Sequence, residues 1–130
     1  MNKLSILIVI FSVSLALFSF KITQEEWVVP AKYENMKNPT DPSADLETGK
    51  ELYKKHCKSC HGVEGYGDGP KAEDLEGDLG DFSSAEFHSQ SDGAIFYKSY
   101  IGKDDMPSFE KKMSENEMWI VINYMKTLAE

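Results

Sequence analysis

The side chains with the clearest chemistry lie in one five-residue stretch, Cys57-Lys58-Ser59-Cys60-His61. Two thiols about one helical turn apart can both add to the vinyl groups on one edge of a haem. The histidine that follows can then supply the fifth ligand of the iron. The spacing therefore predicts one covalently attached haem c, held by Cys57 and Cys60 with His61 bound to iron, and indicates electron transfer or ligand chemistry.

The same cysteines admit weaker alternatives. A redox-active dithiol usually begins a helix after a strand, and no strand pattern precedes Cys57. A zinc site needs four ligands, and a set made of Cys57, Cys60, His61 and His88 matches no structural-zinc spacing. Haem accounts for both cysteines of the chain, which leaves no disulfide framework.

The second axial ligand must come from elsewhere, and Met106 is the favoured residue. It lies in a loop after a predicted helix end, and Pro107 biases its backbone to an extended conformation. A loop residue of this kind can present its sulfur to a buried iron, and a methionine ligand raises the reduction potential. The predicted iron ligands are therefore His61 and Met106.

Other side chains compete with Met106. His88 is the main alternative ligand, and an iron with an open sixth position is another. His56 adjoins Cys57 and is expected to be a solvated helix residue. Met118 and Met125 share one stripe of the last predicted helix, where methionine usually belongs to the core.

A helix is expected to carry the attachment motif. Asp45 is its candidate N-cap, and the helix continues into the two cysteines. Gly49 is tolerable in mid-helix where another helix approaches closely. Positions three and four residues apart define one face of this helix, namely Leu46, Gly49, Tyr53, Cys57 and Cys60.

Three further helices are expected along the rest of the chain. A short one lies near residues 84–87, and Ser91 can cap a second that ends at Gly102. Ser114 and Glu117 form a capping-box pattern before the last helix. Its apolar stripe consists of Met118, Val121, Ile122, Met125 and Leu128. No stretch alternates long enough for a sheet, so the predicted fold class is all-α.

Residues 62–70 hold four glycines and a proline and are expected to form a loop against the haem. No strand precedes them and no Gly-Lys-Ser follows, which argues against a phosphate loop. A backbone carbonyl in this loop, for which Pro70 is the candidate, could accept the free ring N–H of His61 and fix the imidazole.

The chain begins with a targeting pattern. Residues 4–20 carry no charge and are flanked by Lys3 and Lys21, which is typical of a secretory signal. Their length also reaches the lower limit of about 17–25 residues for a membrane span. Residues 1–21 are therefore interpreted as a signal peptide or N-terminal membrane anchor, which predicts a periplasmic protein, soluble or anchored.

Two segments follow the targeting pattern. Residues 22–44 are predicted to be an irregular leader or linker, a tether or wrapping arm in which prolines discourage a helix. Residues 45–130 are the predicted haem domain. A domain this small usually needs a source of stability beyond its own hydrophobic core, and a haem would provide it.

The part predicted to be exported is strongly acidic. All 22 carboxylates lie after position 21, against 12 lysines and no arginine, which gives a formal charge of −10. This charge disfavours nucleic acid and anionic membranes and favours a redox partner with a basic docking patch. Lys54, Lys55 and Lys58 are a local exception beside the motif. They suggest a basic rim for docking, or simply a solvated helix face.

The segment from about 45 to 130 resembles the class I cytochromes c. Gly49 and Tyr53 match the glycine and aromatic of the family's first helix, and Val121 and Tyr124 resemble the pair that crosses there. The resemblance implies a small domain of three to five helices wrapped around one haem.

In that family Cys57 and Cys60 would form the thioethers, and His61 and Met106 would be the axial ligands. The stretches 65–70 and 91–96 are similar to bacterial monohaem members, including haem subunits of respiratory complexes. The basic docking face of mitochondrial cytochromes c is missing.

The expected function is that of an exported monohaem c-type cytochrome, an electron carrier rather than an enzyme. It would pass single electrons between donor and acceptor redox proteins. One alternative is a haem subunit fixed in a membrane respiratory or dehydrogenase complex, which a retained N-terminal segment would favour. A ligand-binding or peroxidatic haem protein with an open iron is a further alternative.

Overall fold

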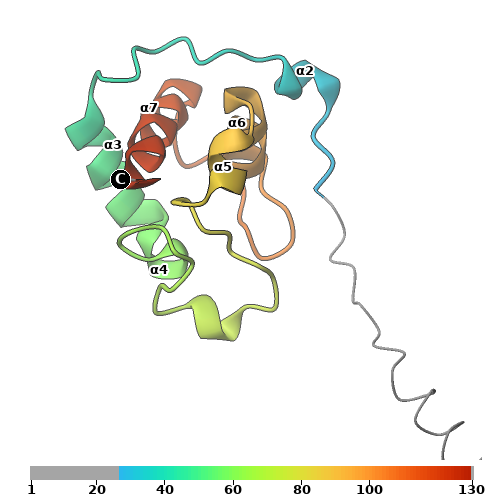
Figure 1. The fold of residues 1–130 in the computed structure, drawn as a ribbon, viewed down its shortest axis with the longest axis vertical. Helices are drawn as coiled ribbons and strands as arrows, with labels where there is room; N and C mark the ends of the chain where they lie inside the picture. The colour runs from blue at the N-terminus through green and yellow to red at the C-terminus, as the bar shows by residue number, and fades with distance from the viewer. Residues whose placement is uncertain (1–26, 130) are drawn as a thin grey trace, which may run out of the picture.

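Two helices cross at the centre of the fold, α3 (Leu46–His56) and α7 (Glu115–Met125), and α6 (Asp92–Ile101) packs beside α7 (Figure 1). The computed structural model describes residues 27–129. Shorter helical turns complete the chain, namely α2 (Ala31–Glu34), α4 (Lys58–His61), η1 (Ala72–Asp74), α5 (Ala85–Ser89) and η2 (Lys126–Ala129). Over residues 27–129 there is no strand, which confirms the all-α prediction.

The predicted signal peptide or anchor, residues 1–21, lies outside the described residues. Between residues 27 and 129, no helix has the length and apolar character needed to cross a bilayer.

Side-chain caps start three helices, namely Ser84 before α5, Ser91 before α6 and Ser114 before α7. Two of them are the serines that the sequence predicts as caps, Ser91 and Ser114, and the third is Ser84, where the sequence predicts a short helix but no cap. Glu117 completes the predicted capping box by accepting from the Ser114 backbone N–H. Asp45 differs, because it precedes α3 in a left-handed conformation (φ 56°) and makes no capping hydrogen bond. The helix begins where predicted, but the predicted cap is wrong.

Gly49 lets α3 and α7 approach closely, as the sequence suggested. A Cβ at this position would lie 2.6 Å from the carbonyl oxygen of Ile120 and 2.9 Å from the Cβ of Tyr124. Four residues further along α3, the Tyr53 ring packs against the Tyr124 ring with centroids 5.4 Å apart. The crossing therefore fixes the end of α3 that leads into the cysteines.

The core forms around the predicted stripe of α7. Its buried members are Met118, Val121, Ile122 and Met125, with Leu128 half-buried against them. From α6, Phe96 stacks on Trp119 with ring centroids 4.3 Å apart. Aromatic pairs of this kind contribute about 0.5–1.5 kcal/mol beyond the area they bury.

The leader forms an arm over α6 and α7 (Figure 1). The Tyr33 ring contacts the Tyr97 ring at 4.7 Å. The buried side chain of Asn123 on α7 accepts a hydrogen bond from Asn38 Nδ2 (2.7 Å) and donates one to Thr40 Oγ1 (2.9 Å). Prolines were expected to discourage a helix here, but one helical turn forms, because Pro30 stands at the start of α2, where no N–H is needed.

Candidate haem attachment site

The backbone gathers Cys57, Cys60 and His61 onto one turn. Helix α3 ends at His56, and Cys57 separates it from α4, so the predicted continuous helix is broken at the first cysteine. The carbonyl oxygen of Cys57 accepts from the N–H groups of Cys60 (3.1 Å) and His61 (3.0 Å). Both sulfurs and the imidazole therefore come from a single hydrogen-bonded unit.

Both thiols are free, and the burial of Cys57 differs from the environment of a redox-active thiol. Cys57 is buried and Cys60 is half-buried. Burial, with a smaller effect from Cys60, raises the pKa of the Cys57 thiol to about 12. Redox-active dithiols instead have a lowered pKa on one sulfur. Within residues 27–129, no three His, Cys, Asp or Glu side chains gather as a metal site.

His61 is a buried side chain without a hydrogen-bonding partner. Its ring stacks on the Phe82 ring at 4.7 Å, and neither Nδ1 nor Nε2 has a hydrogen bond among the described residues. Burial lowers the pKa of His61, and the nearby backbone of Leu79 raises it by less. The neutral ring has a free lone pair, and an unpaired buried polar group is costly. Iron is a partner that would satisfy it, so the residues fit a haem.

The hydrogen bond predicted from His61 to the Pro70 carbonyl is not formed, since neither ring nitrogen has a partner in the part of the chain that the structure describes. The loop nevertheless folds against the attachment turn. The N–H of Gly67 bonds to the His61 carbonyl (2.9 Å) and that of Gly69 to the Cys60 carbonyl (3.0 Å). A Cβ at Gly69 would lie 2.6 Å from the Cys60 carbonyl, so only glycine allows this approach.

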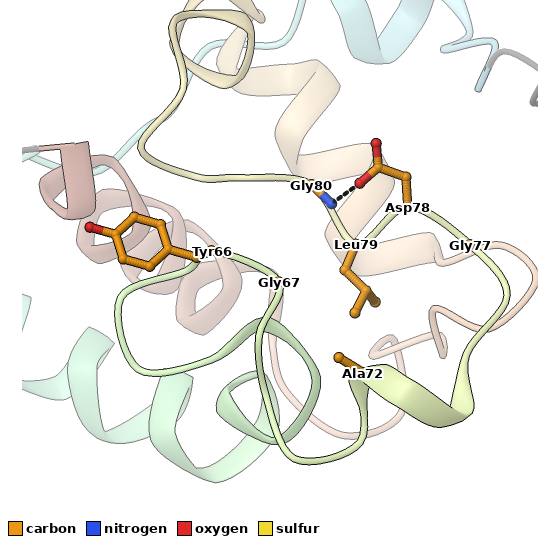
Figure 2. A pocket seen from close by; sticks show the side chains of 7 residues that line it. All are labelled: Tyr66, Gly67, Ala72, Gly77, Asp78, Leu79 and Gly80. Carbon is orange, nitrogen blue, oxygen red and sulfur yellow. Dashed lines mark hydrogen bonds between the residues drawn. The ribbon is translucent and has the colours of Figure 1, made fainter.

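An open recess of about 260 Å³ lies beside this loop. Figure 2 shows Leu79 pointing toward Ala72 across the recess, while Asp78 bonds the N–H of Gly80. Its lining residues are Tyr66, Gly67, Ala72, Gly77, Asp78, Leu79 and Gly80. None of the predicted attachment or ligand residues lines it, but Gly67 in its lining donates to the His61 carbonyl, so the recess adjoins the attachment turn.

Met106 lies in a tight turn after α6. Lys103 and Met106 exchange backbone hydrogen bonds of 2.9 Å, and Gly102 (φ 76°) ends the helix before them. A Cβ at Gly102 would meet the Met106 carbonyl at 2.4 Å. The Met106 side chain is half-buried and packs on the core. Its position is therefore restrained at both backbone and side chain.

The competing side chains are engaged elsewhere. Met118 and Met125 are buried in the core, as the sequence predicted. The Nε2 atom of His88 lies 2.9 Å from the Phe82 carbonyl oxygen. The prediction that His56 is a solvated residue is wrong, because its ring is half-buried against Phe109 at 5.7 Å.

Phe82 is the residue near the site that the sequence analysis missed. Its ring lies between His61 (4.7 Å) and Phe87 (4.8 Å) and is 8% exposed. The available signal was an aromatic residue in an acidic, glycine-broken stretch, which predicts burial but gives no partner.

A helical domain built around a C-x-x-C-H turn is the architecture of c-type cytochromes. The family model for cytochrome c matches residues 46–129, and the chain belongs to this family. Its cofactor is one covalently attached haem c, for which Cys57, Cys60 and His61 form a single binding motif. Residues 46–129 therefore form a c-type haem domain.

No curated protein matches the chain significantly. Among solved structures, the chain is similar to a chain of the reducing HAO-like protein complex of Kuenenia stuttgartiensis, with 32% identity and a TM-score of 0.62. The alignment covers 85% of this chain and 54% of the other, so this chain spans about half of that protein's length. The aligned share exceeds residues 46–129, and the similarity therefore extends beyond the family domain.

Proposed function

We propose that the protein is an exported monohaem cytochrome in which His61 and Met106 bind the iron and single electrons pass between redox proteins. A bound haem supplies an iron that gains or loses one electron. The observation that carries the proposal is the buried His61 ring. It lies on a turn shared with both cysteines, and its two nitrogens have no hydrogen-bonding partner within residues 27–129.

Contacts within the chain hold both proposed ligands, His61 and Met106, in place. The Cys57 carbonyl holds the His61 backbone, and the Phe82 ring covers the imidazole. The hydrogen bonds between Lys103 and Met106 hold the loop that carries the sulfur. Donors held in this way need little movement when the iron changes charge, which favours fast electron transfer.

The lysine patch, defined as Lys54, Lys55 and Lys58, supports docking beside the attachment turn. All three side chains are exposed, and Lys54 pairs with Glu51 at 2.7 Å. The patch gives an acidic protein a local basic surface next to Cys57 and Cys60. A partner with an acidic rim would be attracted there, most strongly at low ionic strength.

Visible spectra of the oxidised and reduced protein, matured in a host that attaches haem, test the ligand proposal. Met106→Ala should abolish the sulfur-to-iron charge-transfer band and leave the haem covalently bound. Met113→Leu is the matched control, because Met113 is a buried core residue (6% exposed) and its replacement should leave the band intact. A band that survives in Met106→Ala would refute Met106 as a ligand.

The second candidate function is a haem subunit held in a larger redox complex. The solved neighbour belongs to a complex, and its similarity to this chain reaches beyond the family domain. Fractionation of host cells with and without detergent, followed by size-exclusion chromatography, separates the candidates. A soluble monomer in the periplasmic fraction supports the free carrier. Elution with other redox subunits, or release by detergent alone, supports the complex.

An open iron is the remaining alternative, and it is tested separately. Carbon monoxide should not bind the reduced protein at neutral pH when both axial positions are filled. Stoichiometric binding without loss of structure would favour the ligand-binding alternative.

A further inference from the structure

His56 connects two segments that are distant in sequence. It ends α3 and immediately precedes Cys57, and its ring meets Phe109 edge-on, with centroids 5.7 Å apart and an interplanar angle of 80°. Phe109 stands three residues after Met106, at the far end of the same loop. The contact therefore links the attachment helix to the loop that carries the proposed ligand.

Phe109 is the fixed point of that loop. It is 3% exposed, and its N–H bonds to the Tyr100 carbonyl at 2.9 Å. Its carbonyl accepts from the N–H groups of Lys112 and Met113. Movement of Phe109 would therefore strain the loop between it and α6, and Met106 lies inside that loop.

The surroundings of His56 favour its neutral ring. Burial lowers the pKa of His56, and Lys55 on the same helix and Lys112 beside Phe109 reinforce the shift. Glu117 on α7 acts in the opposite sense. The ammonium of Lys112 already lies over the Phe109 ring at 5.1 Å. Protonated His56 would place a second positive charge at the edge of that ring. This charge would be repelled by Lys55 and Lys112 and attracted by Glu117.

We propose that neutral His56 braces Phe109 and thereby holds the Met106 loop against the attachment helix, and that protonation of His56 in acid releases this brace. The sign follows from linkage. Since the folded chain favours the neutral ring, the contribution of His56 to the stability of the fold is complete above the ordinary histidine pKa of 6.5. It is lost as the pH falls through the lowered pKa of the folded state. His56 is a positioning residue, because it acts on the ligand loop through Phe109.

Amide hydrogen exchange of the holoprotein tests the brace directly. The N–H groups of Met106 and Phe109 are hydrogen-bonded in the structure, and Ile122 in the buried part of α7 serves as an internal reference. Between about pH 7.5 and pH 5, where a histidine titrates, protection of the two loop amides should fall by a factor of about two to ten relative to the reference.

Three variants separate the brace from a purely structural role. His56→Phe retains an aromatic ring and cannot titrate, so its loop should stay protected at both pH values. His56→Ala should be poorly protected at both. His88→Gln is the control, because it removes the other histidine that is not a proposed iron ligand, and it should respond as the unmodified protein does. Equal acid loss of protection in His56→Phe, or no loss in the unmodified protein, would overturn the proposal.

The effect on the ligand rests on the proposed function, and a second measurement keeps the two apart. The sulfur-to-iron band should weaken in acid in the unmodified protein but not in His56→Phe. If the band is missing at every pH while the exchange pattern holds, Met106 is not the ligand and the brace stands. If the band is present but its pH response is unchanged in His56→Phe, the brace is refuted and the ligand assignment stands.

Discussion

Replacing Gly49 with alanine should destabilise the domain, although alanine is the better helix former. On helix propensity alone the change would stabilise α3 by about 1 kcal/mol. In the folded protein, however, the new Cβ would lie 2.6 Å from the Ile120 carbonyl oxygen and 2.9 Å from the Tyr124 Cβ. Neither atom can rotate away, because one belongs to the backbone and the other is attached to it.

The two effects can be weighed. Overpacking a tight core costs about 1–3 kcal/mol, and a clash with a backbone belongs at the upper end. Subtracting the propensity gain leaves a net loss of about 2 kcal/mol. For a domain of this size that corresponds to a fall in Tm of about 8–16 °C.

Guanidinium unfolding of the holoprotein, followed by far-UV circular dichroism, measures the loss. The midpoint should fall with an unchanged slope, since the surface exposed on unfolding is the same. Gly77→Ala is the matched control, because an added Cβ there has nothing within 4 Å. Its stability should stay within about 0.5 kcal/mol of the unmodified protein. A Gly49→Ala variant as stable as the unmodified protein would refute the close crossing of α3 and α7.

Three further predictions concern the cap of α7, the contact between the arm and α6, and the lysine patch. Ser114→Ala removes the cap of α7 and should reduce the free energy of unfolding by about 1 kcal/mol, measured by the same unfolding curves; no change would contradict the capping box. Gly93→Ala puts a Cβ 1.8 Å from the Tyr33 carbonyl oxygen, so the arm should detach and become sensitive to limited proteolysis, whereas continued resistance would argue against arm docking. Charge reversal of the lysine patch should slow electron transfer to an acidic partner at low salt, with the difference vanishing at high salt. Equal rates at low salt would leave the patch as a solvated face.

Much of the helical framework could be predicted because its signals are local. A serine at the N-cap accepts from backbone N–H groups two or three residues ahead, so Ser84, Ser91 and Ser114 mark helix starts without any tertiary contact. The predictions that were wrong concern segments whose conformation depends on residues that are close in space but distant in sequence. Asp45 adopts a left-handed backbone where a capping residue was expected, and α2 forms on the arm that packs against α6.

The residues of the candidate site also divide into those that local sequence predicts and those that depend on contacts in space. The residues Cys57, Cys60 and His61 could be recognised because haem attachment depends on their short spacing in the sequence. The structure places them on one hydrogen-bonded turn. Phe82 could not be assigned, since its contact with His61 joins residues that the sequence separates by a long loop.

The sequence by itself determined the class of the protein: a C-x-x-C-H turn for one haem, an all-α domain and an acidic surface, each of which depends on residue type and short spacing. Only the tertiary structure decided which side chains meet. It buried His61 with no hydrogen-bonding partner among residues 27–129, bonded the leader to Asn123 and packed His56 against Phe109. The physical reason is that burial, and with it the loss of a hydrogen bond or a shift in pKa, depends on atoms brought together from distant parts of the chain.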